Sequence, residues 1–338
     1  MKKSVFLGAL AATALVAGIA GAGTLDDVKA RGELVCGVHT GLTGFGYPDA
    51  NGDYQGFDVA LCKAIAAAVF GDATKVKYAP LTSETRFTAL ASGEVDLLVR
   101  TSTWTYSRDT DLKFDFVAVN YYDGQGFMVK KDLGVSSAKE LDGATICIQT
   151  GTTTELNLAD FFKQNNITYT PVTVADEAEA QRQYVAGACD SFTTDASGLA
   201  ATRATLADPE NHVILPEIVS KEPLGPVVRH GDNNWGDIVR WTYYALLIAE
   251  EKGITKANIE EVATSTTDPE IKRLLGLEGE MGKMMGLDNT WAKSAIAANG
   301  NYGEIFEANI GASTPIGLAR GLNALWTQGG LQYAPPVR

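Results

Sequence analysis

Short apolar blocks alternate with longer amphipathic stretches over the first hundred residues. In the stretch Asp58–Phe70, apolar side chains at positions 59, 61, 65, 69 and 70 predict a helix with a buried face. The shorter blocks suit strands. The predicted order is a helix 24–31, a strand 33–38, the helix 58–70, a strand 76–80, a helix 83–91 and a strand 95–99. Such an alternation predicts an α/β fold with a doubly wound parallel sheet.

From Phe114 the pattern changes to one long extended stretch, and a second alternation follows. Its predicted parts are a helix-like segment 137–143, strands 144–150, 167–172 and 189–195, helices 156–164 and 177–187, and extended segments 212–216 and 222–232. After Asp232 the chain is mostly helical. We therefore expect two α/β lobes, with 23–122 plus 223–338 as lobe 1 and 123–222 as lobe 2. Crossings near 121–125 and 220–224 would form a hinge that can close around a ligand.

Polar residues follow the apolar run 95–99 directly. After Arg100 come the hydroxyls of Thr101, Ser102 and Thr103, and Arg108 lies five residues further on. Ligands of open α/β sheets sit beyond the carboxyl ends of strands, and an arginine can grip a carboxylate with two parallel hydrogen bonds. The segment therefore predicts a site for a small carboxylate. A structural alternative stays open, in which the hydroxyls cap a turn and Arg108 pairs with a neighbouring aspartate.

The first 22 residues have the form of a secretory signal peptide. Lys2 and Lys3 precede an apolar core, and small residues lead to an expected cleavage after Ala22. The apolar run is shorter than the ~20 residues of a membrane span, and no later segment is long enough. We expect a soluble, exported protein without stable membrane insertion.

The composition excludes several classes of partner. Loss of Lys2 and Lys3 changes the formal net charge from −13 to −15, which argues against binding nucleic acid. The three histidines, His39, His212 and His230, belong to no cluster with metal-ligand spacing, and no G-x-S-x-G motif is present. We expect no metal, no cofactor and no hydrolase site.

The four cysteines all lie in the mature chain, and an oxidising compartment permits disulfides. Three pairings are possible. We predict Cys36–Cys62 and Cys147–Cys189, because each pair then lies inside one lobe. Four buried free thiols are the alternative.

The chain resembles the periplasmic solute-binding proteins of polar amino acid ABC transporters. The resemblance covers nearly the whole mature chain. Within this family, the chain is similar to the branch that takes up glutamate, glutamine, aspartate, asparagine and a broader set of L-amino acids. It implies the two-lobe type II "flytrap" fold, with a C-terminal extension after about Gly253. It rests on GFDVALCKAIAAAVFGD, TSETRFTALASGEVDLLVRTSTWTYSRDTDLKFDFV, IQTGTTTELNLADFF, AGACDSFTTDASGL and PLGPVVRHGDNNWGDIVRW.

The resemblance also implies which residues hold the ligand's α-carboxylate and α-ammonium. Thr101 by its backbone and Thr103 by its hydroxyl would bind the carboxylate beside Arg108. Thr153, between a strand and a helix N-terminus, would complete that site. Asp195, at the end of the strand 189–195, would hold the ammonium. The competing Asp190 lies at the start of that strand, and we interpret it as a turn residue.

The ligand's side chain would meet four further residues under the same resemblance. Arg86 and Ser83 match positions that hold a side-chain carboxylate in binders of acidic amino acids, although Arg86 could also be a solvated helix charge. His39 stands where such a binder has arginine, and a neutral imidazole can serve amides as well as acids. Phe45 would pack on the ligand's aliphatic part, with ordinary core packing as the alternative.

These expectations favour a binding protein over an enzyme. The partners would be a free L-amino acid and a membrane permease, the location the periplasm, and the protein a monomer. A periplasmic cyclohexadienyl or arogenate dehydratase on the same fold is the alternative function. It would use the same arginine but would need an added general acid or base in the cleft.

Overall fold

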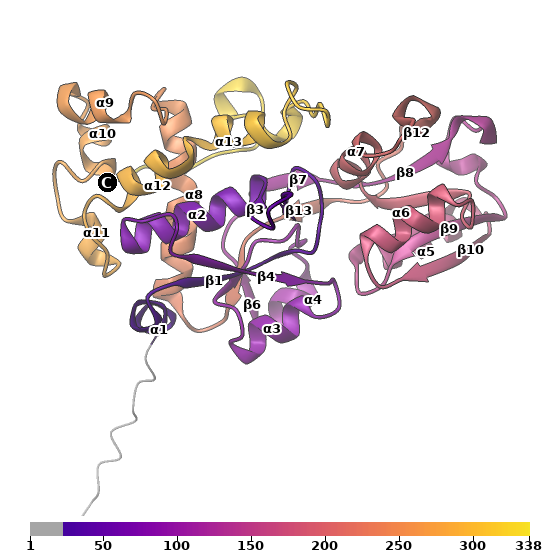
Figure 1. The fold of residues 1–338 in the computed structure, drawn as a ribbon, viewed down its shortest axis with the longest axis horizontal. Coiled ribbons are helices and arrows are strands. Elements are labelled where there is room, and N and C mark those ends of the chain that lie inside the picture. Colours follow the sequence, from indigo (N-terminus) through magenta and orange to yellow (C-terminus); the bar gives the residue numbers. More distant parts are fainter. Residues whose placement is uncertain (1–22) are drawn as a thin grey trace, which may run out of the picture.

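The structure, a computed structural model, describes residues 23–338, and the predicted signal peptide lies outside them. Two α/β lobes lie side by side along the long axis of the molecule, each built around its own five-stranded sheet (Figure 1). The predicted two-lobe α/β fold is therefore confirmed. In the described part of the chain, no helix is long and apolar enough to cross a membrane, and no cluster of side chains could hold a metal ion.

The sheet of lobe 1 has the order β4-β1-β5-β14-β6. β1 pairs in parallel with β4 and β5, whereas β14 pairs antiparallel with β5 and β6. The interior strand β1 is almost entirely buried, as expected for a strand covered on both faces. The bounds are β1 Leu34–His39, β4 Val76–Leu81, β5 Leu97–Leu98, β6 Phe114–Phe116 and β14 Val227–Arg229, with a small hairpin of β2 Tyr47–Pro48 and β3 Tyr54–Gln55.

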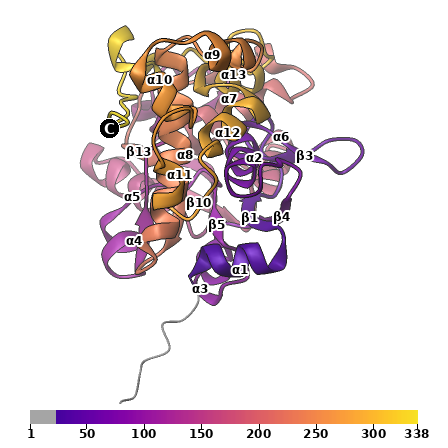
Figure 2. The ribbon, with the colours of Figure 1, turned by 90° about the vertical axis from the view of Figure 1, so that its left-hand side faces the viewer.

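The helices of lobe 1 come from both ends of the chain. The apolar helix α2 packs against α8 and α12, and α13 covers the same side (Figure 2). Trp235 and Tyr243 of α8 are fully buried in the resulting core. The bounds are α1 Thr24–Arg31, α2 Phe57–Phe70, α3 Arg86–Ser92, α4 Tyr106–Thr110, α8 Asn233–Glu251, α9 Ile259–Ser265, α10 Pro269–Leu274, α11 Met281–Met284, α12 Trp291–Asn299, α13 Tyr302–Asn309, and the 3₁₀ turns η4 Gly321–Asn323 and η5 Trp326–Gln328.

Lobe 2 has the sheet order β10-β9-β11-β8-β12. β9 pairs in parallel with β10 and β11, and β8 pairs antiparallel with β11 and β12. The segment 137–143, predicted helix-like, forms only the short 3₁₀ turn η2. The bounds are β8 Gln125–Lys130, η1 Lys131–Leu133, η2 Ala138–Glu140, β9 Ala144–Gln149, α5 Thr153–Asn165, β10 Tyr169–Val174, α6 Glu177–Val185, β11 Ser191–Asp195, α7 Ala196–Ala204, η3 Pro209–Asn211 and β12 His212–Ile214.

Two paired strands connect the lobes. β7 (Tyr121–Asp123) runs antiparallel to β13 (Glu222–Leu224), and both cross between the sheets at the centre of Figure 1. The chain therefore passes twice through the hinge, as predicted. The expected lobe boundaries fall at this strand pair and stay a prediction.

The C-terminal extension contacts this hinge directly. The side-chain amide of Asn323 accepts a hydrogen bond from the backbone N–H of Tyr122 at 2.6 Å and donates one to its carbonyl at 3.0 Å. Gln332 accepts a bond from the Tyr243 hydroxyl, and Tyr302 donates to the carbonyl of Asn120 at 2.9 Å. The extension thus packs on lobe 1 and also contacts the residues on which the lobes would turn.

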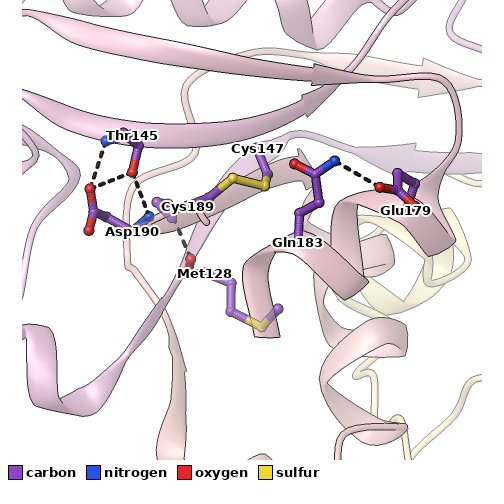
Figure 3. Close-up of a disulfide and its surroundings, with 8 residues drawn as sticks. Met128, Thr145, Cys147, Glu179, Gln183, Cys189 and Asp190 are labelled. Carbon is purple, nitrogen blue, oxygen red and sulfur yellow. Dashed lines mark hydrogen bonds between the residues drawn. A yellow bond between two sulfur atoms is a disulfide. The ribbon is translucent and has the colours of Figure 1, made fainter. Parts of the chain in front are cut away.

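Each lobe contains one disulfide, and the two pairs are those predicted. Cys36 on β1 joins Cys62 on α2 with their Cα atoms 6.2 Å apart. Cys147 on β9 joins Cys189, just before β11, with a Cα separation of 5.6 Å (Figure 3). Both bridges tie a central strand to its neighbouring segment, and no described cysteine is free.

Candidate functional site

A polar cavity lies between the lobes. Its walls come from the carboxyl ends of β1 and β5 in lobe 1 and of β9 and β11 in lobe 2, together with the starts of α3, α5 and α6. The lining residues are mostly polar: His39, Leu42, Ser83, Arg86, Arg100, Thr101, Thr103, Gln149, Thr152, Thr153, Thr154, Glu177, Thr194, Asp195, Ser197 and Gly198. Seven of the nine predicted ligand residues are among them, and Arg108 and Phe45 are not.

Two buried arginines of lobe 1 line this cavity. Arg100 donates to the Leu81 carbonyl at 2.8 Å and to the Ser83 hydroxyl at 3.2 Å. Arg86 donates to Ser102 at 3.3 Å and, across the lobes, to the Gly151 carbonyl at 3.4 Å, while its Nε–H is buried without a partner. Burial lowers the pKa of both guanidinium groups, that of Arg100 to about 10, and repulsion from Arg108 lowers both further. Arginine stays charged in proteins, so an anionic or amide group would be well placed beside them.

Arg108 lies behind Thr103. Its guanidinium donates to the Thr103 carbonyl at 2.8 Å and lies 5.0 Å from the centre of the Phe87 ring. Burial lowers its pKa to about 10, against the opposing attraction of Glu222 and Asp195. Its cationic field therefore reaches the part of the cavity near Thr103, although its side chain is not in the cavity wall.

Thr101 has an uncommon backbone conformation, with φ +39°. Its backbone N–H, which the resemblance assigns to the ligand carboxylate, donates to Asp58 Oδ2 at 3.0 Å. Asp58 is buried at the start of α2 and also accepts from Asn120. In this structure the N–H of Thr101 is thus already bonded to Asp58, which holds the strained turn at the end of β5.

The hydroxyls of Thr103 and Thr153 converge on one internal carboxylate. Both donate to Glu222 Oε2 on the hinge strand β13, the bond from Thr153 measuring 2.9 Å. The other Glu222 oxygen accepts from Asn157 at 2.8 Å and from Ser220 at 2.7 Å. The two hydroxyls, one from each lobe, therefore already form a carboxylate-binding pair in this structure.

Asp195 ends β11 and faces the arginines from lobe 2. Burial, with Asp123, Glu222 and Glu177 nearby, raises its pKa well above the usual value, and Arg86 only partly opposes this. A cation placed beside Asp195 would lower the cost of its charge. Asp190 lies at the other end of the strand, where its carboxylate accepts from the N–H and hydroxyl of Thr145 (Figure 3). Asp190 therefore fixes the start of β11 to β9 and is not among the residues that line the cavity.

His39, at the end of β1, connects the lobes. Its Nδ1 accepts from the Gly41 N–H at 3.1 Å, which leaves the proton on Nε2, 3.4 Å from Glu177 Oε2 on α6. Burial and Arg100 lower its pKa, so the imidazole is neutral at pH 7. Phe45 is fully buried, and its ring packs edge-on against Phe57 and Tyr121 rather than lining the cavity.

Sequence reasoning did not identify Arg100, Glu177 or Glu222 as site residues. The rule that strand ends carry ligand groups applied to Arg100 as much as to the hydroxyls after it, so that signal was present. Glu222 carries no comparable sequence signal. Only the pairing of β13 with β7 places it next to residues of both lobes.

The sequence model of the bacterial extracellular solute-binding proteins, family 3, matches residues 34–273. The chain belongs to this family, and its fold is the type II periplasmic binding protein fold. It is 77% identical, over the full length of both chains, to the glutamate/glutamine/aspartate/asparagine-binding protein BztA of Rhodobacter capsulatus. Likewise over the full length of both, it is 59% identical to the general L-amino acid-binding periplasmic protein AapJ of Rhizobium johnstonii.

Solved structures agree with this assignment. A periplasmic binding protein of an ABC transporter from Brucella ovis, solved with glutathione bound, superposes with a TM-score of 0.92 at 57% identity, covering 94% of this chain and 100% of that one. An ancestral amino acid-binding protein described as a precursor of cyclohexadienyl dehydratase gives a TM-score of 0.58 at 30% identity, over 69% of this chain and 96% of that one. The relative linked to the dehydratase alternative is thus a distant one.

Proposed function

We propose that this protein captures free L-amino acids in the periplasm and delivers them to the membrane permease of an ABC transporter. Glutamate, glutamine, aspartate and asparagine are the expected ligands, with a broader set possible by the same head-group contacts. The single observation that carries the proposal is the carboxylate of Glu222 on the hydroxyls of Thr103 and Thr153. Each hydroxyl has one proton to donate, so a ligand carboxylate would take these two donors in place of Glu222, within reach of the field of Arg108.

The remaining groups suit the rest of an α-amino acid. Asp195 would pair with the α-ammonium, and Arg86, Arg100, Ser83 and His39 would receive the side chain. Hydrogen bonds to charged groups contribute about 1.5–3 kcal/mol each. A few of them, less the cost of ordering, support micromolar or tighter binding, which corresponds to about −8 kcal/mol.

Closure would couple the ligand to transport. Lobe 1 and lobe 2 already meet through the bonds from Arg86 to Gly151 and from Thr150 to Glu84, the latter 3.0 Å long. A ligand that contacts both walls binds the closed form more tightly than the open one, and so shifts the population towards closure. The permease would then recognise the closed form.

The Brucella ovis relative was solved with glutathione, whose glutamyl end keeps a free α-carboxylate and α-ammonium. The same free α-carboxylate and α-ammonium are proposed to bind at this site. Glutathione and a free amino acid therefore differ in the size of the part that follows these two groups.

The test is thermal unfolding of the mature protein, freed of ligand by denaturation and refolding, with each of the twenty L-amino acids. A ligand at about 100 times its Kd should add roughly 2.7 kcal/mol to the free energy of unfolding. Shifts are expected for the four named amino acids, and Arg108→Lys should weaken all of them by similar factors. Absence of a shift with every amino acid would refute the proposal.

A further inference from the structure

A second cavity lies beside the ligand cavity, on the other side of His39, Leu42 and Glu177, which line both. It runs between the loop after β1 in lobe 1 and the helices α6 and α7 in lobe 2. The shared wall is thin, because it consists of one apolar side chain and the contact between His39 Nε2 and Glu177 Oε2. A ligand held in the first cavity therefore needs to pass only this contact to enter the second.

The wall lies at the end of the cavity expected to hold the ligand's side chain. His39 Nε2 lies 3.4 Å from Glu177 in this wall. At the carboxylate end, Arg108 donates to the Thr103 carbonyl at 2.8 Å, and the Thr103 hydroxyl lies 3.5 Å from that of Thr153. An amino acid bound by its α-carboxylate and α-ammonium would thus point its side chain towards His39 and the second cavity.

The wall can itself bind an amide. His39 Nε2–H is a donor, and Glu177 is an acceptor whose other oxygen is fixed by the Thr202 hydroxyl at 3.2 Å. A secondary amide placed between them would accept from His39 through its carbonyl and donate to Glu177 through its N–H. Both wall groups would then exchange their contact with each other for a hydrogen bond to the ligand.

The second cavity offers groups for a further residue that carries a carboxylate. Its polar lining includes the hydroxyls of Thr43 and Thr205, the amide of Gln181 and the exposed guanidinium of Arg182, which also pairs with Glu179. The carboxylates of Asp176 and Glu177 also line this cavity, but Asp176 caps α6 by accepting from the Glu179 N–H, and Glu177 belongs to the shared wall. The hydroxyls, the amide and Arg182 are left for the polar terminus of a short peptide.

We propose that this protein also binds γ-glutamyl peptides, with the glutamyl head in the first cavity, the γ-amide between His39 and Glu177, and the added residue in the second cavity. The inference rests on the proposed function, since the head group must be held as in a free amino acid. An α-linked glutamyl peptide does not fit this arrangement, because its α-carboxylate is consumed in the peptide bond.

The test is calorimetric titration of the mature, ligand-free protein with glutamate, γ-glutamylglycine and α-glutamylglycine. We expect γ-glutamylglycine to bind within about tenfold of glutamate, and α-glutamylglycine at least 100-fold more weakly. Binding of glutamate without γ-glutamylglycine would overturn the inference and leave the proposed function intact. Binding of neither would also overturn the inference, and the thermal-unfolding panel of twenty amino acids would then decide separately whether the proposed function holds.

Tryptophan substitutions test whether the added residue of the peptide lies in the second cavity. Ala178 is exposed on α6 and lines only the second cavity, so Ala178→Trp should weaken γ-glutamylglycine at least tenfold and change glutamate less than twofold. Thr205→Trp tests the same cavity from the end of α7. Ala186→Trp, at the exposed C-terminus of α6, is the matched control and should change neither ligand. Equal weakening of both ligands by Ala178→Trp and Thr205→Trp, or no effect of either, would place the added residue elsewhere and overturn the inference.

Discussion

The two walls of the ligand cavity carry opposite charge. Lobe 1 contributes the guanidinium groups of Arg86 and Arg100, with Arg108 behind them, whereas lobe 2 and the hinge contribute Asp195, Glu177 and Glu222. Like charges on one wall raise each other's cost of burial, and the opposite wall compensates only when the lobes are close. An amino acid, which carries both charges on one carbon atom, complements both walls at once.

The difference in charge between the walls also means that the head group and the side chain of the ligand are recognised by different groups. Every α-amino acid needs one anion and one cationic or hydroxyl site for its head. Lobe 1 has more positive charge than a head group requires, and the surplus lies beside His39 and Ser83, where a side chain would end. Acidic and amide side chains are therefore the ones that lobe 1 can favour.

Removing the anion of lobe 2 should have the largest effect. Loss of one partner of a buried charge pair costs about 3–5 kcal/mol, so Asp195→Asn should weaken every amino acid several hundred-fold in calorimetric titration. The same change relieves a carboxylate whose pKa burial has raised, so the ligand-free protein should unfold at the same or a higher temperature. Asp190→Asn, at the other end of β11, is the matched control for affinity. A parallel loss of ligand-free stability in Asp195→Asn would show a structural role instead.

The carboxylate behind the lobe 1 wall should make stability depend on pH. Burial raises the pKa of Asp58 to about 6, so the folded state holds this proton more tightly than the unfolded chain does. Its contribution is therefore present below about pH 4 and is lost as the pH rises through 6, a change on the order of 3 kcal/mol. Asp58→Asn should flatten this part of the profile in denaturant titrations, and Asp53→Asn, on the exposed hairpin, should not. Identical profiles for all three proteins would contradict the assignment.

Weakening the positive wall should change selectivity rather than binding as a whole. Arg86→Ala removes one charged donor at the side-chain end, worth about 2 kcal/mol, so glutamate and aspartate should lose roughly 30-fold relative to small neutral amino acids. Titration with glutamate and alanine measures the ratio, with Lys77→Ala on the exposed edge strand β4 as control. A uniform loss across the ligands would mean that Arg86 holds the lobes together through Gly151 and does not select side chains.

Sequence patterns were sufficient for the scaffold, whereas most of the cavity wall was assigned through the resemblance to a family. Short apolar blocks and the helical period predicted β1, α2 and the second alternation, since their burial depends on local order. Boundaries were less accurate. The run 95–99 forms only the short strand β5, because Val95 is still bonded to the carbonyl of Ala89 at the end of α3.

Features that arise from long-range pairing were missed. Glu222 lies in an extended crossing without any local signal, and Arg100 marks the end of a hydrophobic run, which sequence reasoning interpreted as a boundary only. The helices α9 to α12 after Gly253 are four to nine residues long, too short to show a clear period. The packing of α12 on α2, α8 and α9, and the contact of the later turn η4 with β7, appear only in three dimensions.

The contact of η4 with β7 lies at the hinge, which sets the distance between the two charged walls. Removing this contact should have the smallest of the expected effects. Asn323 bonds both the N–H and the carbonyl of Tyr122, as a neighbouring strand would. Asn323→Ala should therefore cost about 1 kcal/mol of unfolding free energy and speed hydrogen exchange at the Tyr122 amide, whereas Leu322→Ala, an exposed neighbour, should do neither. Asn323→Asp keeps the acceptor for the Tyr122 N–H and should retain most of the protection. If exchange at Tyr122 were unchanged in Asn323→Ala, the extension would only cover lobe 1, and the spacing of the walls would depend on β7 and β13 alone.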